Sequence, residues 1–142
     1  LLFHLVFATK NREKTIVHEH KKQLYAYIWG ILKNNNCHLY RINGVEDHIH
    51  ILVSLHPTVA LASLVKDIKL ASTEFIKTNK LFEHFKGWQE GYGAFTYSTR
   101  EREMLINYIK NQEAHHSKKT FLEEYLDYLK EFEIEFDERY LL

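Results

Sequence analysis

The sequence has 142 residues, of which 45% are hydrophobic and 27% charged, enough apolar material for one domain with a sizeable core. Its one cysteine, Cys37, excludes an internal disulfide and any zinc site built from several cysteines. No apolar run approaches the roughly 18 residues of a membrane-spanning helix, and no signal-peptide pattern is visible. We therefore expect residues 1–142 to form a single soluble, cytoplasmic domain.

The formal net charge is zero, but charge is divided unevenly along the chain. Residues 1–120 hold 17 Lys and Arg against 11 Asp and Glu, whereas residues 121–142 hold 2 against 8. A basic body with an acidic tail suits contacts with phosphate groups, although a solvated acidic helix without function would give the same pattern.

The first half of the chain predicts a strand, a helix and a hairpin. Leu2–Ala8 is rich in apolar, β-favouring residues and predicts the strand. Apolar residues then recur at helical spacing, at Leu24, Ile28, Ile31 and Leu32. Residues 37–45 and 48–55 are typical of two strands, which Glu46 and Asp47 connect through a tight turn into an antiparallel hairpin.

The second half predicts a helix, a strand and two further helices. An amphipathic pattern follows Pro57, and a glycine-hinged loop at residues 87–98 leads into a strand. Thr99 opens a third helix that runs past residue 112, and a fourth spans residues 121–132. The expected fold class is α+β: an antiparallel sheet with helices on one face, ferredoxin-like or RRM-like βαββαβα, plus a C-terminal helix.

The most informative motif is His48-Ile49-His50, in the strand predicted over residues 48–55. Alternate side chains of a strand share one face, so the two imidazoles lie close enough to bind one divalent metal ion. Two polar residues on the solvent side of a half-buried strand would be a simpler explanation. Further polar residues on the third predicted helix favour the metal site.

Tyr108 and Gln112 are four residues apart on that helix, so both side chains project from one face. A tyrosine in a helix usually belongs to the core. Together with the histidines, however, this pair supplies a metal site and a nucleophile, the parts needed for covalent phosphoryl transfer. His115 and His116 continue near the same face, and His116 is an additional candidate ligand that could compete with Gln112.

Tyrosine has an unperturbed pKa of about 10, so it attacks phosphate at neutral pH only if the developing charge is stabilised. A divalent ion held by His48, His50 and the amide oxygen of Gln112 would polarise the scissile phosphate and stabilise the departing 3′ oxygen. We expect Mg²⁺ or Mn²⁺, of which Mn²⁺ suits imidazole better by ligand softness.

Three segments carry a family resemblance: residues 3–12 (FHLVFATKNR), 47–52 (DHIHIL) and 108–112 (YIKNQ). On them the sequence resembles the HUH single-tyrosine transposases of bacterial insertion sequences, the TnpA type that acts on single-stranded DNA. The resemblance covers nearly the whole chain. It implies that Tyr108 is the nucleophile forming a 5′-phosphotyrosine bond, that His48 and His50 are metal ligands, and that Gln112 completes the coordination.

The same resemblance implies partners and a location. It implies a homodimer in which the tyrosine helix is able to complete the histidine site of the partner subunit, recognition of DNA hairpins at the element's ends, and association with the bacterial nucleoid. Relatives that process chromosomal repeats belong to the same family. Candidate DNA contacts are the basic residues Lys10, Arg12, Lys14, Lys66 and Lys69, with Tyr92, Phe95 or Tyr97 for base stacking.

Two other functions remain open from the sequence. A non-catalytic domain that binds single-stranded nucleic acid would use Tyr108 only for structure. A metal-dependent nuclease would use the histidines to activate water, and would need a general base such as Glu46 or Asp47.

Overall fold

A computed structural model describes residues 2–97 and 102–111. Its strands and helices follow in the predicted order through the third predicted helix: β1 (Leu2–Ala8), α1 (Lys21–Asn34), β2 (His38–Val45), β3 (His48–Ser54), α2 (Leu61–Thr78), β4 (Gly93–Tyr97) and α3 (Arg102–Lys110). Two short 3₁₀ helices, Lys10–Arg12 and His18–His20, connect β1 to α1. The helix predicted over residues 121–132 lies outside the described residues.

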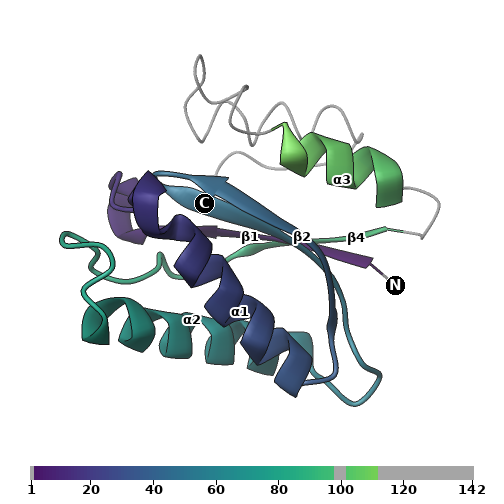
Figure 1. The fold of residues 1–142 in the computed structure, drawn as a ribbon. Helices are drawn as coiled ribbons and strands as arrows, with labels where there is room; N and C mark the ends of the chain where they lie inside the picture. Colours follow the sequence, from purple (N-terminus) through teal and green to yellow (C-terminus); the bar gives the residue numbers. More distant parts are fainter. Residues whose placement is uncertain (1, 98–101, 112–142) are drawn as a thin grey trace.

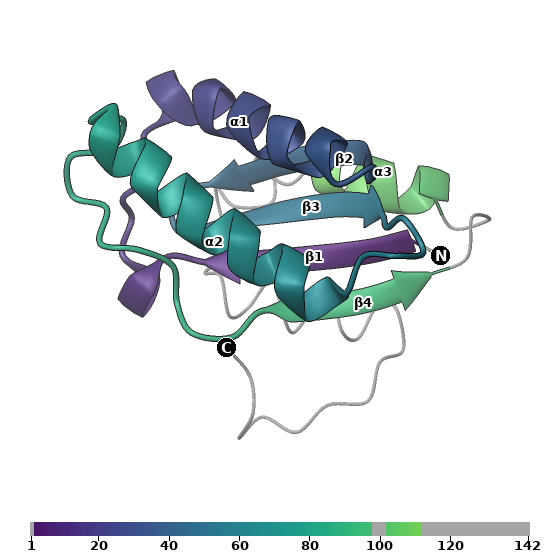
Figure 2. The same cartoon turned by 90° about the horizontal axis from the view of Figure 1, so that it is seen from below.

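The four strands form one antiparallel sheet in the order β2-β3-β1-β4 (Figure 2). β1 and β3 lie in the middle of the sheet, and their register pairs Val6 with His50 and Ala8 with His48. β2 pairs with β3 across the predicted hairpin, with Val45 opposite His48. The predicted α+β class with an antiparallel sheet is confirmed.

The helices cover both faces of the sheet, which corrects part of the prediction. α1 and α2 lie together on one face as expected, but α3 lies on the opposite face (Figure 1). Successive residues of a strand point to opposite faces of the sheet. Because helices cover both faces, β1 and β3 carry apolar residues at odd-numbered and at even-numbered positions. One set, including Phe7 and Ile51, packs with α1 and α2, whereas Leu2 and Leu52 pack with α3.

None of the helices described here is long and apolar enough to cross a membrane.

The turn at Glu46 and Asp47 is held by the segment that follows β1. The Asp47 carbonyl accepts a hydrogen bond from the backbone N–H of Thr9 at 2.8 Å. The Glu46 carbonyl accepts from the backbone N–H groups of Thr15 and Ile16, at 3.0 and 2.9 Å. These bonds satisfy both carbonyls of the turn, and they fix the point at which β3 begins.

Gly44 allows β2 to approach β3 closely beside this turn. A Cβ atom on Gly44 would lie 2.5 Å from the carbonyl oxygen of His48 and 2.9 Å from the Cα of Ile49. Both neighbours are backbone atoms in the middle of a sheet, so neither can move aside without displacing β3. The start of β3 therefore depends on the absence of a side chain at position 44.

We expect Gly44→Ala to lower the free energy of unfolding by about 1–3 kcal/mol, because overpacking displaces backbone. Gly30→Ala is the matched control: Gly30 lies inside α1, where an added Cβ has no atom within 4 Å. The control should stabilise the protein by about 0.5–1 kcal/mol, since glycine weakens a helix interior. Urea denaturation measures both, and an unchanged Gly44→Ala variant would contradict the close approach.

Candidate active site

The two histidines of the motif are buried side by side on one face of β3. Their relative exposures are 0% for His48 and 4% for His50, and their ring centroids are 5.2 Å apart. The face they share is the one that α3 covers, because Leu52, two residues further along the strand, packs against α3. The prediction that both imidazoles share a face is confirmed. The simpler explanation, in which both would lie on the solvent side of the strand, is wrong because both are buried.

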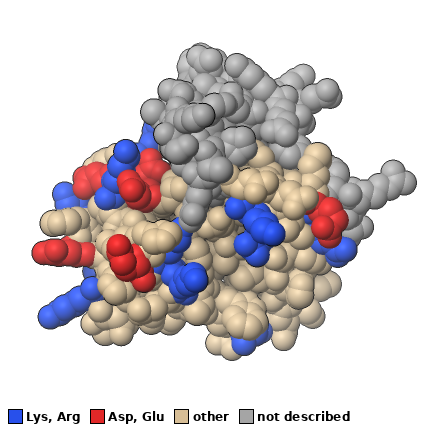
Figure 3. Space-filling model, turned by 45° about the horizontal axis from the view of Figure 1, so that its top comes forward, with Lys and Arg blue, Asp and Glu red and all other residues tan. Residues whose placement is uncertain are grey.

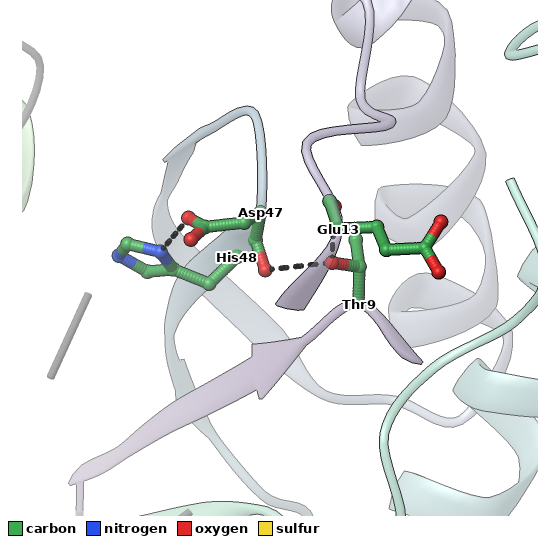
Figure 4. A network of polar contacts seen from close by, with 4 residues as sticks. All are labelled: Thr9, Glu13, Asp47 and His48. Carbon is green, nitrogen blue, oxygen red and sulfur yellow. Dashed lines mark hydrogen bonds and ion pairs between the residues drawn. The ribbon is translucent and has the colours of Figure 1, made fainter. Parts of the chain in front are cut away.

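Asp47 orients the ring of His48. Its Oδ1 lies 2.7 Å from Nδ1 of His48, so the protonated Nδ1 donates to the carboxylate (Figure 4). Thr9 is buried next to Asp47, with its hydroxyl 3.2 Å from the Asp47 backbone carbonyl and 2.6 Å from the Glu13 carbonyl. With the hydrogen on Nδ1, the lone pair of the neutral ring is on Nε2. The carboxylate thus selects the nitrogen that His48 can offer to a metal ion.

His4 makes the corresponding contact with His50. Nε2 of His4 lies 2.7 Å from Nδ1 of His50, and both side chains are buried. His4 belongs to β1, where it pairs with Leu52 and is therefore a diagonal neighbour of His50 on the same face. His4 was not among the site residues predicted from the sequence. The sign that could have indicated it is a single histidine in an otherwise apolar strand, at a position whose side chain points to the same face as the motif.

Tyr108 lies over these histidines. Its ring centroid is 6.2 Å from that of His50 and 6.5 Å from that of His4. α3 is docked there by Leu105 and Ile109, both 0% exposed, which pack against the sheet. One chain therefore brings its own tyrosine next to its own histidine motif.

Asn43 of β2 ties the end of α3 to the sheet. Its Nδ2 donates to the Ile109 carbonyl at 3.3 Å, and its Oδ1 accepts from the backbone N–H of Gly44 at 2.9 Å. The last carbonyls of a helix have no partner within the helix, so this side chain satisfies one of them. Asn43 also pairs with His50 across the hairpin, which links the position of α3 to that of the motif.

The remaining predicted ligands lie outside the described residues: Gln112, His115 and His116. Within the described part of the chain, no group of three or more His, Cys, Asp or Glu side chains is arranged to hold a metal ion. A metal site at His48 and His50 would therefore need at least one further donor. An amide oxygen from Gln112, just beyond α3, stays the prediction for that donor.

The predicted DNA contacts fall into two groups. Lys10, Arg12 and Lys14 are exposed and follow β1, whose last residue Ala8 is opposite His48. Lys66 is exposed on α2, which covers the other face of the sheet. Figure 3 shows basic side chains in several separate clusters, with acidic side chains beside some of them. Of the two groups, the first lies nearer to the histidines.

Lys69 has contacts within the protein. Its Nζ donates to the carbonyls of Gln89 and Gly91, at 2.9 and 2.5 Å, in the segment that leads into β4. Partial burial lowers the pKa of its ammonium group, and Glu90 acts in the opposite direction. Its predicted role in DNA binding thus competes with a visible role in holding this segment.

The aromatic residues expected to stack on bases are partly used by the fold. Tyr92 is half-buried and meets Phe7 edge to face, with ring centroids 6.4 Å apart. Phe95 is half-buried 6.2 Å from His4, on the face that carries the motif. The side chain of Tyr97 is not described. Of the two described rings, Phe95 is therefore the one placed near the histidines.

Comparison with known proteins now identifies the family. The sequence profile of the family described as "Transposase IS200 like" matches residues 1–112, which is most of the chain. The chain belongs to the IS200-like transposase family. An IS200-like transposase is a DNA-processing enzyme, so the buried histidines and Tyr108 lie in a protein of that class.

Individual relatives agree with this assignment. The ISDra2 transposase TnpA of Deinococcus radiodurans is 29% identical over 117 residues, which cover 79% of this chain and 84% of that protein. The crystal structure of a candidate transposase from Deinococcus radiodurans R1 superposes with a TM-score of 0.60 at 27% identity, covering 79% and 90% of the two chains. A REP-associated tyrosine transposase bound to a REP hairpin has the same fold, with a TM-score of 0.65 at 15% identity over 81% and 67% of the chains.

We expect Lys69→Met to lower the free energy of unfolding by about 1–3 kcal/mol, since two hydrogen bonds from a charged donor are lost. Lys66→Met, on the exposed side of the same helix, is the matched control and should change stability by less than about 0.5 kcal/mol. Urea denaturation of both variants tests this. Equal stabilities would show that the contacts of Lys69 contribute nothing measurable to the fold.

Proposed function

We propose that this transposase cleaves and rejoins single-stranded DNA, with Tyr108 as the nucleophile. The observation that carries the proposal is the position of the Tyr108 ring, 6.2 Å from that of His50, above two buried imidazoles whose orientations are fixed. A tyrosine close to imidazoles that could hold a metal ion combines a nucleophile with a site for an activating ion, the parts that covalent phosphoryl transfer uses.

The donor set fits a divalent metal ion. Asp47 contacts Nδ1 of His48 and His4 contacts Nδ1 of His50, so Nε2 is the nitrogen that each ring has left to offer a metal ion. His48 and His50, with Gln112 as the proposed third ligand, would hold Mg²⁺ or Mn²⁺. Such an ion, when bound, supplies positive charge that polarises the scissile phosphate and stabilises the departing oxygen.

In the cleavage step, the Tyr108 oxygen attacks the phosphorus of a phosphodiester. The bond between phosphorus and the Tyr108 oxygen forms, and the bond between phosphorus and the 3′ oxygen breaks. The phenol loses one proton and the departing 3′ oxygen gains one, so protons balance. One phosphodiester is exchanged for another, and the resulting 5′-phosphotyrosine can be attacked by a later 3′ hydroxyl without an external energy source.

The described geometry gives the two other functions less support. Asp47, a candidate general base for a nuclease, is hydrogen-bonded to His48 and serves to orient it. A binding domain that uses an open sheet would need a free face, but α3 packs against β2 and β3 on the face that carries the histidines. A nucleophile on α3 agrees better with both observations.

The substrate and assembly remain part of the proposal. A fold relative was solved bound to a REP hairpin, which supports a DNA hairpin as the structure recognised here. Lys10, Arg12 and Lys14 are the basic residues that we propose contact it first, because they follow β1 at the end that pairs with His48. We further propose a homodimer in which each subunit can use its own Tyr108.

The test is a denaturing gel of the protein after incubation with Mn²⁺ and labelled single-stranded oligonucleotides from the genomic flanks of its own gene. Wild type should give a covalent protein–DNA adduct. Tyr108→Phe keeps the packing of the ring but removes the attacking oxygen, so adduct formation should fall by at least about 1,000-fold.

Tyr40→Phe is the matched control, because Tyr40 also packs in the cluster beneath α3. It should form the adduct at the wild-type rate. Metal-dependent cleavage without an adduct would instead support the nuclease, and binding of the genuine flanks without cleavage would support the binding domain.

A further inference from the structure

Among the described residues, three imidazoles and not two are buried together beneath α3. His4 is 0% exposed, and its ring centroid lies 4.9 Å from that of His50. It comes from β1, forty-six positions before His50 in the sequence, and it is outside the motif that defines the proposed metal site. Burying a third polar ring in a core is costly unless it is hydrogen-bonded, so its presence calls for a role.

His4 is not placed as a third ligand of the same ion. Its Nε2 is directed at Nδ1 of His50, 2.7 Å away, on the side of that ring remote from Nε2. Consistent with this, no group of three His, Cys, Asp or Glu side chains among residues 2–97 and 102–111 forms a metal-binding arrangement. His4 therefore contacts the proposed ligand His50 at Nδ1, the ring nitrogen that a metal ion bound to Nε2 would leave unused.

We propose that His4 is a positioning residue that fixes the tautomer and orientation of His50, an inference that rests on the proposed metal site. Nε2 of His4 accepts a hydrogen bond from the protonated Nδ1 of His50, which leaves the lone pair of His50 on Nε2. A ligating histidine generally gives its second N–H to such a partner, and losing that partner typically costs 10- to 100-fold in metal affinity.

The two histidines of the motif thus have different partners. Asp47 provides a carboxylate for His48, whereas His4 provides a neutral imidazole for His50. Of these two partners, only Asp47 brings a negative charge. A second carboxylate in place of His4 would further reduce the positive charge that a bound ion presents to a phosphate.

The test compares His4→Leu, which removes the acceptor, with His4→Gln, which offers an amide oxygen in its place. Binding of Mn²⁺ to the DNA-free protein is measured from the loss of the free-ion EPR signal. His4→Leu should bind Mn²⁺ about 10- to 100-fold more weakly than wild type. His4→Gln should recover most of the affinity, and His84→Leu, at a fully surface position, should leave it unchanged.

Nitrogen-15 NMR of the metal-free wild type reports the tautomer directly and does not depend on whether a variant folds. His50 should carry its hydrogen on Nδ1. A hydrogen on Nε2 of His50, or wild-type Mn²⁺ affinity in a folded His4→Leu, would overturn the role of His4. Failure of the wild type itself to bind Mn²⁺ while His50 shows the expected tautomer would instead count against the proposed metal site.

Discussion

The register of β3 is the constraint on which the candidate site depends. Side chains alternate between the two faces of a strand, so a shift of one residue would move His48 and His50 to the face covered by α1 and α2 and bring Ile49 and Ile51 beneath α3. Three features oppose such a shift: the hydrogen bonds that hold the turn at Glu46 and Asp47, the close approach at Gly44, and the pairing of β3 with strands on both sides. The hairpin alone therefore determines that both histidines point to the face that α3 covers.

Burial of the histidines has a cost that the surrounding side chains offset. Asp47 and His4 each occupy a ring nitrogen that would otherwise lose its hydrogen bonds to water. The same contacts restrict the orientation of each ring, so stability and preorganisation have a common origin here. α3 adds the apolar contacts of Leu105 and Ile109, and these bring the tyrosine of the same helix to the imidazoles. The packing of α3 against the sheet, and not a separate loop, therefore positions the proposed nucleophile Tyr108.

Much of this arrangement could be predicted from local patterns. Alternation and turn residues gave the hairpin and the shared face of His48 and His50, and helical spacing gave α1 and α2. The face on which α3 lies was missed, because the periodicity of a helix shows which of its sides is apolar but not which layer it meets. Apolar residues at both odd-numbered and even-numbered positions of β1 and β3 were the sign that both faces of the sheet are covered. The contacts of His4 and Lys69 depend on strand order and on packing between elements distant in sequence, which one sequence does not encode locally.

In the proposed site, His48 and His50 hold one divalent ion beside Tyr108. Crystals grown with Mn²⁺ and measured for anomalous scattering would test it most directly. We expect one strong anomalous peak within bonding distance of Nε2 of both histidines, on the side of the site that faces Tyr108. A well-ordered motif with no peak, or a peak bound only elsewhere on the protein, would contradict it.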